Sequence, residues 1–539
     1  MTRQLYRNAR IFTAAERPWA EAVVVEDQRL LYVGDDTTAA RLAGDGAEAI
    51  DLGGRLVLPG FVDGHAHVVG TGEAAQQVDL WGASSVEEIQ RRISEWAADH
   101  PHAPRIRAQG WAHGAFAGGH PHREMLDSVI ADRPVYAQAY DYHSIWLNSA
   151  ALSEVGIDAD TEAPAGGTIH ADAAGPTGLV DETAMHRLVW PVLDALVTLD
   201  DLVTALRASL ASYRKIGVTA VTEMALDEGD LAAMTTVEEA GELTARITAH
   251  WRVQPTGDDS ANLAQVARAA ELAALHTSPH LRITGIKVLV DGTVDGCTAA
   301  LRAPYVDGSS AEPIWTLSEL APVIIAADAA GLQVAMHAIG DEAVAIAIDA
   351  VEAAIAANGP RPRRHRIEHL EVVGPDEIER LAALGITASM QPVHADPAIQ
   401  DNWRAMLGDD RIDRGFPWPE MTAAGAPLVF GTDSPTSPQA PLPNMFIAAT
   451  RRSALDPALP ANLPRYAVSL PEAITHATRD AAWASRRDGE FGRLSAGLFA
   501  DFIVLDTDVF AADPEALLTA EVVRTVLGGR TVYERADAV

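Results

Sequence analysis

The sequence predicts an α/β fold made of a (β/α)8 TIM-type barrel, a small β-sandwich domain formed by both termini, and a large insertion after barrel strand 1. Three observations support this prediction. Short apolar strands alternate with Ala-rich amphipathic helices through the middle of the chain, both ends are rich in β-type segments, and a long gap separates the first two strands. Such alternation is typical of parallel βα units. The length of 539 residues suits a large barrel with accessory parts.

Eight short apolar segments have the composition of buried parallel strands. These predicted strands are Leu56–Asp63, Gly217–Met224, Arg246–Val253, Ile283–Asp291, Gln333–His337, Arg364–Leu370, Gly385–Gln391 and Pro427–Asp433. Predicted helices between them include Leu317–Ala330, Glu342–Asn358 and Asp376–Leu384. Eight strand–helix units are the number that closes a (β/α)8 barrel.

The two ends predict one β-sandwich domain, formed by residues 1–57 and 480–539. Ala22–Glu26 and Leu30–Val33 form a hairpin pattern near the N-terminus, and Gly528-Gly529 is a turn signal near the C-terminus. Residues 58–479 then hold the barrel. The insertion at about 71–205 is far longer than an ordinary barrel connection of about 2–6 residues. We therefore expect it to cap the active site.

Composition excludes several function classes. The formal charge of −34 arises from 41 basic and 75 acidic residues. A surface of this kind repels phosphate backbones and anionic lipid, so we expect a small-molecule substrate and neither nucleic acid nor membrane as a partner. No signal-peptide pattern or apolar stretch of about 18 residues is present, which predicts a cytoplasmic protein. The single cysteine, Cys297, excludes an internal disulfide and a Cys-based zinc site. Association into a dimer is plausible for such a barrel.

A His-x-His pair follows the first predicted strand. In a strand, residues two apart point to the same side, so His65 and His67 converge at the C-terminal end, where barrel active sites lie. Two neutral imidazoles on one face suit Zn²⁺ or a similar divalent ion. The alternative is that both are solvent-exposed loop residues.

Other strand ends carry further candidate ligands. His337 and His369 end two later strands, and Asp433 ends the last one. Two of them also have a structural interpretation, since His337 could be a hydrogen-bonded core residue and Asp433 a helix N-cap. His365 has the same parity as His369 but lies at the strand entry, so we expect it to face solvent.

Lys287 lies inside an apolar strand and is one of only two lysines, the other being Lys215. Burying an unpaired ammonium is costly, so the position requires compensation. One possibility is a salt bridge to Asp291 or Asp295. The other is chemical modification, which Lys permits and Arg does not.

Taken together, these segments resemble the amidohydrolase superfamily, and more narrowly the amidohydrolase family 3, YtcJ-like branch that includes N-substituted formamide deformylases. The resemblance spans nearly the whole chain. It is carried by the His-x-His pair, Asp433, and the segments Lys287–Gly292, Met336–Asp341, His365–His369, Gly492–Asp501, Gly110–His113 and Tyr140–Ser144.

The resemblance implies the following site. His65, His67 and Asp433 bind a first divalent metal, most naturally Zn²⁺, and His337 and His369 bind a second. Lys287, carboxylated on its side-chain nitrogen, bridges both, although one metal or two is left open. The implied reaction is hydrolysis of a C–N bond, such as an N-formyl or N-acyl amide, with Asp433 as the catalytic base.

Alternatives for function stay open at this stage. The same scaffold supports hydrolysis of esters or cyclic amides, deamination and isomerisation, and a non-catalytic scaffold protein is a more remote alternative. Four residues of the insertion are candidates for binding the substrate, with loop packing as the alternative interpretation: Trp111, His113, Tyr142 and His143.

Overall fold

The structure is a computed structural model, and it describes residues 3–116, 120–139, 144–164 and 167–536. The chain divides into two compact units. One contains residues 1–71 and 209–539, and the other contains residues 72–208. The first unit holds the barrel and the sheets of both termini, and the second is the insertion.

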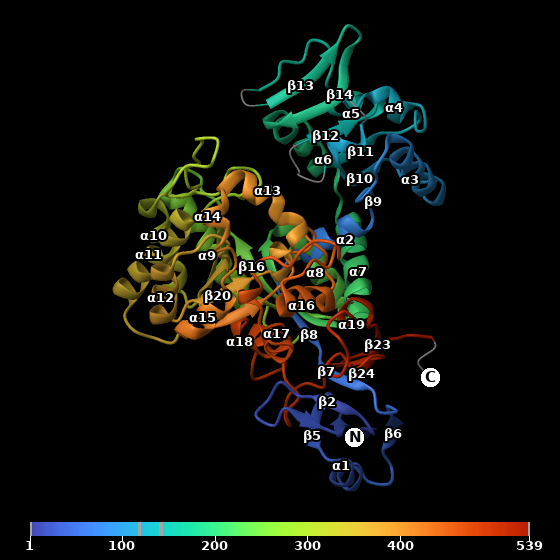
Figure 1. The fold of residues 1–539 in the computed structure, drawn as a ribbon, viewed down its shortest axis with the longest axis vertical. Helices are drawn as coiled ribbons and strands as arrows, with labels where there is room; N and C mark the ends of the chain where they lie inside the picture. The colour runs from blue at the N-terminus through green and yellow to red at the C-terminus, as the bar shows by residue number, and fades with distance from the viewer. Residues whose placement is uncertain (1–2, 117–119, 140–143, 165–166, 537–539) are drawn as a thin grey trace. The chain divides into compact units, whose positions relative to one another are not determined.

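The barrel is one eight-stranded parallel sheet that follows chain order. Figure 1 labels β8, β16 and β20 of this sheet among the surrounding helices. Its strands are β8 (Phe61–Ala66), β15 (Val218–Leu226), β16 (Arg246–Arg252), β17 (Leu281–Leu289), β18 (Gln333–Ala338), β19 (Arg366–His369), β20 (Thr387–Met390) and β21 (Leu428–Phe430). The strands are buried almost throughout, as parallel strands covered on both faces must be. The predicted (β/α)8 fold is therefore confirmed.

Contacts between the first and last strands close the barrel. The backbone N–H of Asp433 donates to the carbonyl of His65 at 2.7 Å. Both the backbone N–H and the hydroxyl of Thr432 donate to the buried carboxylate of Asp63, at 2.9 and 2.6 Å. At Gly64, an added Cβ would lie 2.6 Å from the carbonyl oxygen of Phe430, so only glycine fits this approach. The closure brings the ends of strands one and eight to the same place.

Amphipathic helices cover the outside of the strands. They include α8 (Glu228–Glu239), α9 (Asp259–Leu275), α10 (Leu317–Ala329), α11 (Asp341–Asn358), α12 (Pro375–Leu384) and α16 (Pro441–Thr450). A capping box of Thr316 and Glu319 begins α10, and Gly385 in the left-handed region ends α12. These helices confirm the three predicted segments to within a residue or two.

Two sheets form the terminal domain. The first contains β5 (Arg29–Gly34), β4 (Ala22–Glu26), β1 (Arg3–Arg7) and β6 (Glu48–Asp51). The second contains β24 (Arg530–Glu534), β23 (Val522–Leu527), β22 (Phe502–Leu505), β7 (Leu56–Pro59), β2 (Arg10–Phe12) and β3 (Trp19–Ala20). Tyr6, Val57 and Phe502 belong to one shared core, so the sheets pack as the predicted sandwich.

One predicted strand is two strands in the structure. The segment Leu56–Asp63 breaks at Gly60, where β7 ends in the terminal sheet and β8 begins in the barrel. An added Cβ at Gly60 would lie 2.1 Å from the hydroxyl of Thr219, so the chain passes very close to β15 at this point. Both halves are apolar because each lies in a hydrophobic core, so the sequence pattern gives no sign of the break between them.

The end of the barrel opposite the site is held by a buried ionic cluster around Asp328. Its carboxylate accepts hydrogen bonds from Arg361 and Arg363 and pairs with His365 at 3.0 Å. The prediction that His365 faces solvent is wrong, because only 1 % of its side chain is exposed. Its other ring nitrogen accepts from the N–H of Val334, so His365 ties strand six to strand five.

The insertion has its own sheet and core. Its strands are β13 (Gly167–Asp172), β14 (Gly175–Glu182), β12 (Ser144–Leu147), β11 (Val135–Ala139), β10 (Ile106–Trp111) and β9 (Val78–Asp79), in that spatial order. The amphipathic helix α3 (Val86–Asp99) packs Ile89 and Ile93 into the same core. The insertion is therefore a folded unit with an apolar interior.

Candidate metal centre

The C-terminal ends of the barrel strands gather the predicted ligands. His65 lies near the end of β8, Lys287 in β17, His337 in β18 and His369 at the end of β19, and Asp433 follows β21. His65, Lys287 and His369 are at most 2 % exposed, whereas about a third of the His67 side chain is exposed. Parallel strands put these residues at one mouth, because their carboxyl ends all point the same way.

Asp433 is the shared centre of this group. Its Oδ1 lies 3.2 Å from Nε2 of His65 and 3.3 Å from Nε2 of His67. Its Oδ2 lies 3.7 Å from Nε2 of His394 and 4.0 Å from Nδ1 of His369. Two triads, His65–His67–Asp433 and His369–His394–Asp433, each have donor atoms within 4.8 Å of one another. Ligands that share one tetrahedral zinc lie about 3.3 Å apart, so the first triad has the spacing of a zinc site.

Two of these residues have strained backbones. Asp433 has φ of +61° and His369 has φ of +77°. Non-glycine residues in this left-handed region cost of the order of 1–3 kcal/mol and tend to cluster at functional sites. The fold therefore holds Asp433 and His369 at the mouth of the barrel in conformations that lower its stability.

Each imidazole in the two triads has a partner that orients it. Nδ1 of His65 lies 2.7 Å from Glu368, Nδ1 of His67 lies 3.8 Å from Glu223, and Nδ1 of His394 lies 3.0 Å from Glu371. Nδ1 of His369 lies 2.9 Å from the amide oxygen of Gln391. Ligating histidines characteristically use one nitrogen for a carboxylate or carbonyl and the other for the metal. The arrangement thus has the donor chemistry that a divalent ion requires.

Glu368 is itself held by a buried arginine. Arg366 donates to both oxygens of Glu368, at 2.5 and 3.0 Å, and also to the carbonyl of Gly64 and the hydroxyl of Ser389. Burial raises the pKa of Glu368, but Arg366 and His65 outweigh it and hold that pKa well below the usual range. Glu368 is therefore an ionised acceptor for His65.

The protonation states of Asp433, His369 and His337 suit metal binding. Burial raises the pKa of Asp433, but His65 and His67 hold it well below its usual range, so Asp433 is a carboxylate. Burial, together with the neighbouring His337, lowers the pKa of His369 well below its usual value. Burial also lowers the pKa of His337 to about 3. Neutral imidazoles and a carboxylate are the forms that bind metal. Burial lowers the pKa of His67 and of His394, but their carboxylate partners outweigh it, raising the pKa of His67 to about 9 and that of His394 above its usual value. These two histidines would therefore release a proton when an ion binds.

His337 lies beside the second triad but outside it. Its ring centroid is 4.4 Å from that of His369. Its Nε2 lies 3.0 Å from the carbonyl oxygen of Gly292 and 3.6 Å from the carboxylate of Asp291. This leaves Nδ1 as the nitrogen through which His337 would bind an ion.

Lys287 lies at the base of the site with its ammonium buried. Burial lowers the pKa of Lys287 to about 8, although Glu368 and Asp433 raise it. Asp291, one of the predicted salt-bridge partners, instead accepts backbone hydrogen bonds from Ala300, Ile339 and Gly340. An amine with a pKa near neutrality has an appreciable unprotonated fraction, which is the nucleophilic form.

Of the four predicted substrate-binding residues of the insertion, the structure describes the side chain of Trp111. Trp111 is fully buried in the core of the insertion, and its indole N–H donates to the carbonyl of Ala137 at 2.7 Å. Packing within the insertion therefore accounts for this residue. The side chain of His113, and Tyr142 and His143 as a whole, lie outside the described residues.

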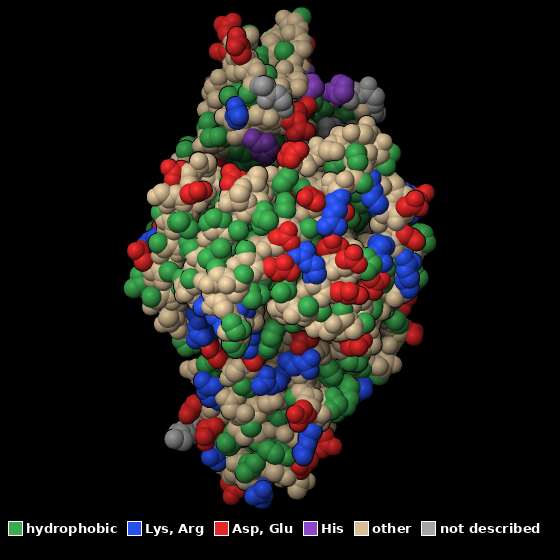
Figure 2. Space-filling view, turned by 90° about the vertical axis from the view of Figure 1, so that its left-hand side faces the viewer, with side chains coloured by type: hydrophobic (Ala, Val, Ile, Leu, Met, Phe, Trp, Pro, Cys, Tyr) green, Lys and Arg blue, Asp and Glu red, His purple; other side chains and the backbone are tan. Residues whose placement is uncertain are grey.

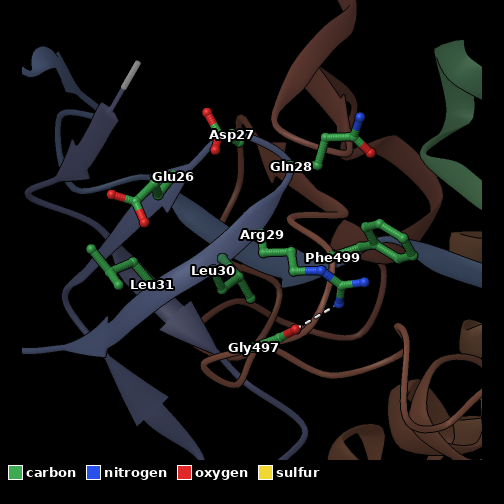
Figure 3. A pocket seen from close by; sticks show the side chains of 8 residues that line it. All are labelled: Glu26, Asp27, Gln28, Arg29, Leu30, Leu31, Gly497 and Phe499. Carbon is green, nitrogen blue, oxygen red and sulfur yellow. Dashed lines mark hydrogen bonds between the residues drawn. The ribbon is translucent and has the colours of Figure 1, made fainter. Parts of the chain in front are cut away.

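The terminal domain contains a pocket that is separate from the candidate metal centre. A pocket of about 680 Å³ lies in the terminal domain, where Arg29 donates to the carbonyl of Gly497 and covers the ring of Phe499 (Figure 3). None of the site residues lines it.

Acidic side chains are interspersed with basic ones over the face in Figure 2, in keeping with a solubilising surface. Among the helices that the structure describes, none combines the length and hydropathy needed to span a bilayer.

A parallel barrel with a histidine–carboxylate cluster at its C-terminal mouth defines a metal-dependent hydrolase. A family model described as the amidohydrolase family matches residues 48–533, and the chain belongs to this family.

Similar proteins extend over nearly the whole chain. The YtcJ protein of Bacillus subtilis (strain 168) is 32 % identical, with 96 % of each chain covered. The N-substituted formamide deformylase of Arthrobacter pascens is 28 % identical, with 98 % of each chain covered. A solved structure of an uncharacterized metal-dependent hydrolase from Pyrococcus furiosus is 29 % identical, has a TM-score of 0.77, and covers 94 % of this chain and 99 % of its own.

Proposed function

We propose that this protein hydrolyses the amide C–N bond of a small molecule, of the N-formyl or N-acyl amine class, with divalent metal held at the mouth of the barrel. The observation that carries this proposal is the position of Asp433, whose two oxygens face separate groups of imidazoles. The 28 % identical deformylase acts on an N-substituted formamide, as its name states, which supports the choice of bond.

The residues present fit a metal. His65, His67 and Asp433 would hold a first ion, and zinc is the natural choice because the donors are imidazole nitrogen and carboxylate oxygen. A second ion would be held by His369 with the neighbouring donors, to which the resemblance adds His337 and Lys287. A divalent ion bound here supplies a Lewis acid that polarises a carbonyl and lowers the pKa of water to about 7.

Asp433 performs the proton transfers in this proposal. As an ionised carboxylate at the centre of the site, it accepts a proton from the attacking water as the carbonyl carbon gains its new bond to oxygen. It then gives that proton to the leaving nitrogen as the C–N bond breaks, so the products are a carboxylic acid and an amine. General acid–base transfer of this kind contributes about 10²–10⁴-fold to the rate.

Lys287 is proposed to be carboxylated. A carbamate is anionic, and at this position it would face Glu368 and Asp433, so it requires a neighbouring cation to be stable. The low pKa of Lys287 supports this chemistry, since the unprotonated amine reacts with CO₂. The modification would also remove the cost of a buried ammonium.

A substrate panel tests the reaction. Purified protein loaded with Zn²⁺ or Mn²⁺ in bicarbonate is assayed with N-formyl amines, N-acetyl amines, matched esters, cyclic imides and aminopurines. The proposal predicts the highest kcat/KM for an N-formyl or N-acyl amine. Turnover confined to esters, cyclic imides or aminopurines would contradict it.

A further inference from the structure

We infer that His394 is a metal ligand, that it completes a second cation position with His369 and Asp433, and that Glu371 positions it. This inference rests on the proposed metal-dependent function. It differs from the ligand set that the resemblance implies, in which the second position draws on strands four, five and six. Here it draws on strands six, seven and eight.

The carboxylate of Asp433 is the first line of support, because it divides the donors into two groups. Its Oδ1 lies 3.2 and 3.3 Å from the two histidines of strand one, and its Oδ2 lies 3.7 Å from Nε2 of His394. The same Oδ2 lies 4.0 Å from Nδ1 of His369, which also contacts Gln391. A carboxylate whose oxygens serve different donor groups has the geometry to bridge two ions.

The pairing of His394 with Glu371 is the second line. Nδ1 of His394 lies 3.0 Å from Oε1 of the buried Glu371, which leaves Nε2 directed towards Asp433. His65 is arranged in the same way, with Nδ1 on Glu368 and Nε2 on Asp433. His65 and His394 therefore share one pattern, which is the pattern of oriented metal ligands.

The backbone around His394 is well anchored. His394 lies in the short helix η3 (Pro392–Ala395) that follows β20, and its N–H donates to the carbonyl of Gln391 at 3.0 Å. Asp396 then accepts from the N–H of Ala398 and the N–H of Ala454. The ring of His394 stacks on that of His369 at 5.7 Å, with 10° between the planes. The imidazole is thus held in place before any ion arrives.

His337 lies beside this triad. It belongs to neither triad among the residues that the structure describes, and its Nε2 lies 3.0 Å from the carbonyl oxygen of Gly292. His394 therefore completes the triad with His369 and Asp433, and His337 would add a further donor through its Nδ1.

Titration of the metal-free protein with Co²⁺ tests the inference, because visible absorption reports the ligands and elemental analysis reports the ions per chain. The variants are His394→Asn, which removes the ligand, and Glu371→Gln, which keeps the shape but removes the carboxylate. His276→Asn is the control, since it removes a histidine that lies between α9 and the start of β17, at the opposite end of the barrel.

We expect His394→Asn to lose one bound ion per chain, or to bind it at least tenfold more weakly, with a changed Co²⁺ spectrum. Glu371→Gln should weaken the same ion by about 10–100-fold, and this variant keeps the test valid if His394→Asn folds poorly. Unchanged Co²⁺ binding and spectra in both variants would overturn the inference. Wild-type protein that binds no ion at all would instead overturn the proposed function itself.

Discussion

The carboxylate of Glu368 and Nδ1 of His65 lie 2.7 Å apart, and both side chains are almost completely buried. The pair joins strand six to strand one, next to the other candidate metal ligands. Because Glu368 orients His65, we expect Glu368→Gln to weaken binding of the first metal by about 10–100-fold. Competition with a chelator measures this affinity.

Glu352→Gln is the matched control for Glu368→Gln, because Glu352 is exposed on α11. Glu368 also neutralises Arg366, so unfolding of each variant in urea is recorded alongside. A variant that is destabilised yet binds metal as tightly as wild type would show that Glu368 serves the fold alone.

Asp433→Asn should reduce turnover by at least 10²-fold, because an amide cannot accept the proton from water. The amide retains the shape of the carboxylate, so the fold should persist, which circular dichroism checks. Rates are measured at saturating metal, so that weaker metal binding does not account for the loss. Wild-type turnover in this variant would exclude Asp433 as the base.

Lys287→Gln should lower the metal content, because it removes the proposed carbamate. Wild-type protein incubated with ¹³C-bicarbonate should show a carbamate carbon signal by NMR that Lys287→Gln lacks. Lys215→Arg is the matched control, since Lys215 is the only other lysine and is exposed on α7 (Leu199–Ile216). A carbamate signal that survives in Lys287→Gln, or no signal in wild type, would contradict the assignment.

The candidate ligands at the strand ends could be predicted from the sequence. His65 and His369 lie in β8 and β19, and His67 and Asp433 follow β8 and β21 within three residues. His394 was not predicted because it lies four residues beyond the end of β20, on a short helix to which the alternation of strand side chains does not apply. The sequence feature that could have indicated His394 is its position just after the seventh predicted strand, at the C-terminal mouth of the barrel.

The carboxylates that orient the histidines could not be predicted. Glu368 and Glu371 come from strand six and the loop after it, and their partners lie on other strands, so only the closed barrel shows the pairs. His365 was misassigned for a related reason. Its partner Asp328 lies on α10, 37 residues earlier, and nothing near His365 in the sequence reveals that contact.

Asp328 gives a pH-dependent prediction. Burial raises the pKa of Asp328, but hydrogen bonds from Arg363 and Arg361 outweigh it and hold this pKa well below its usual value. A depressed pKa means that the charged form stabilises the fold above about pH 4, and that this contribution is lost as the pH falls. Asp328→Asn should therefore destabilise the protein at pH 7, by about 3 kcal/mol, because it leaves Arg363, whose side chain is only 8 % exposed, without its carboxylate partner.

The difference in unfolding free energy between wild type and Asp328→Asn should narrow below about pH 4, because Asp328 becomes protonated in the unfolded chain while the folded protein keeps its carboxylate charged. Urea unfolding at several pH values, followed by tryptophan fluorescence, measures this difference. Asp413→Asn, an exposed position, is the control. A constant difference from pH 7 to pH 3 would contradict the ionic account of this cluster.

The most direct test of the central claim is the metal content of purified protein after incubation with zinc and bicarbonate and removal of free ions. The account predicts at least one tightly held ion per chain in wild type, and its loss when His65 and His67 are both replaced by Asn. Wild-type protein that retains no ion, or a double variant that retains as much as wild type, would contradict it.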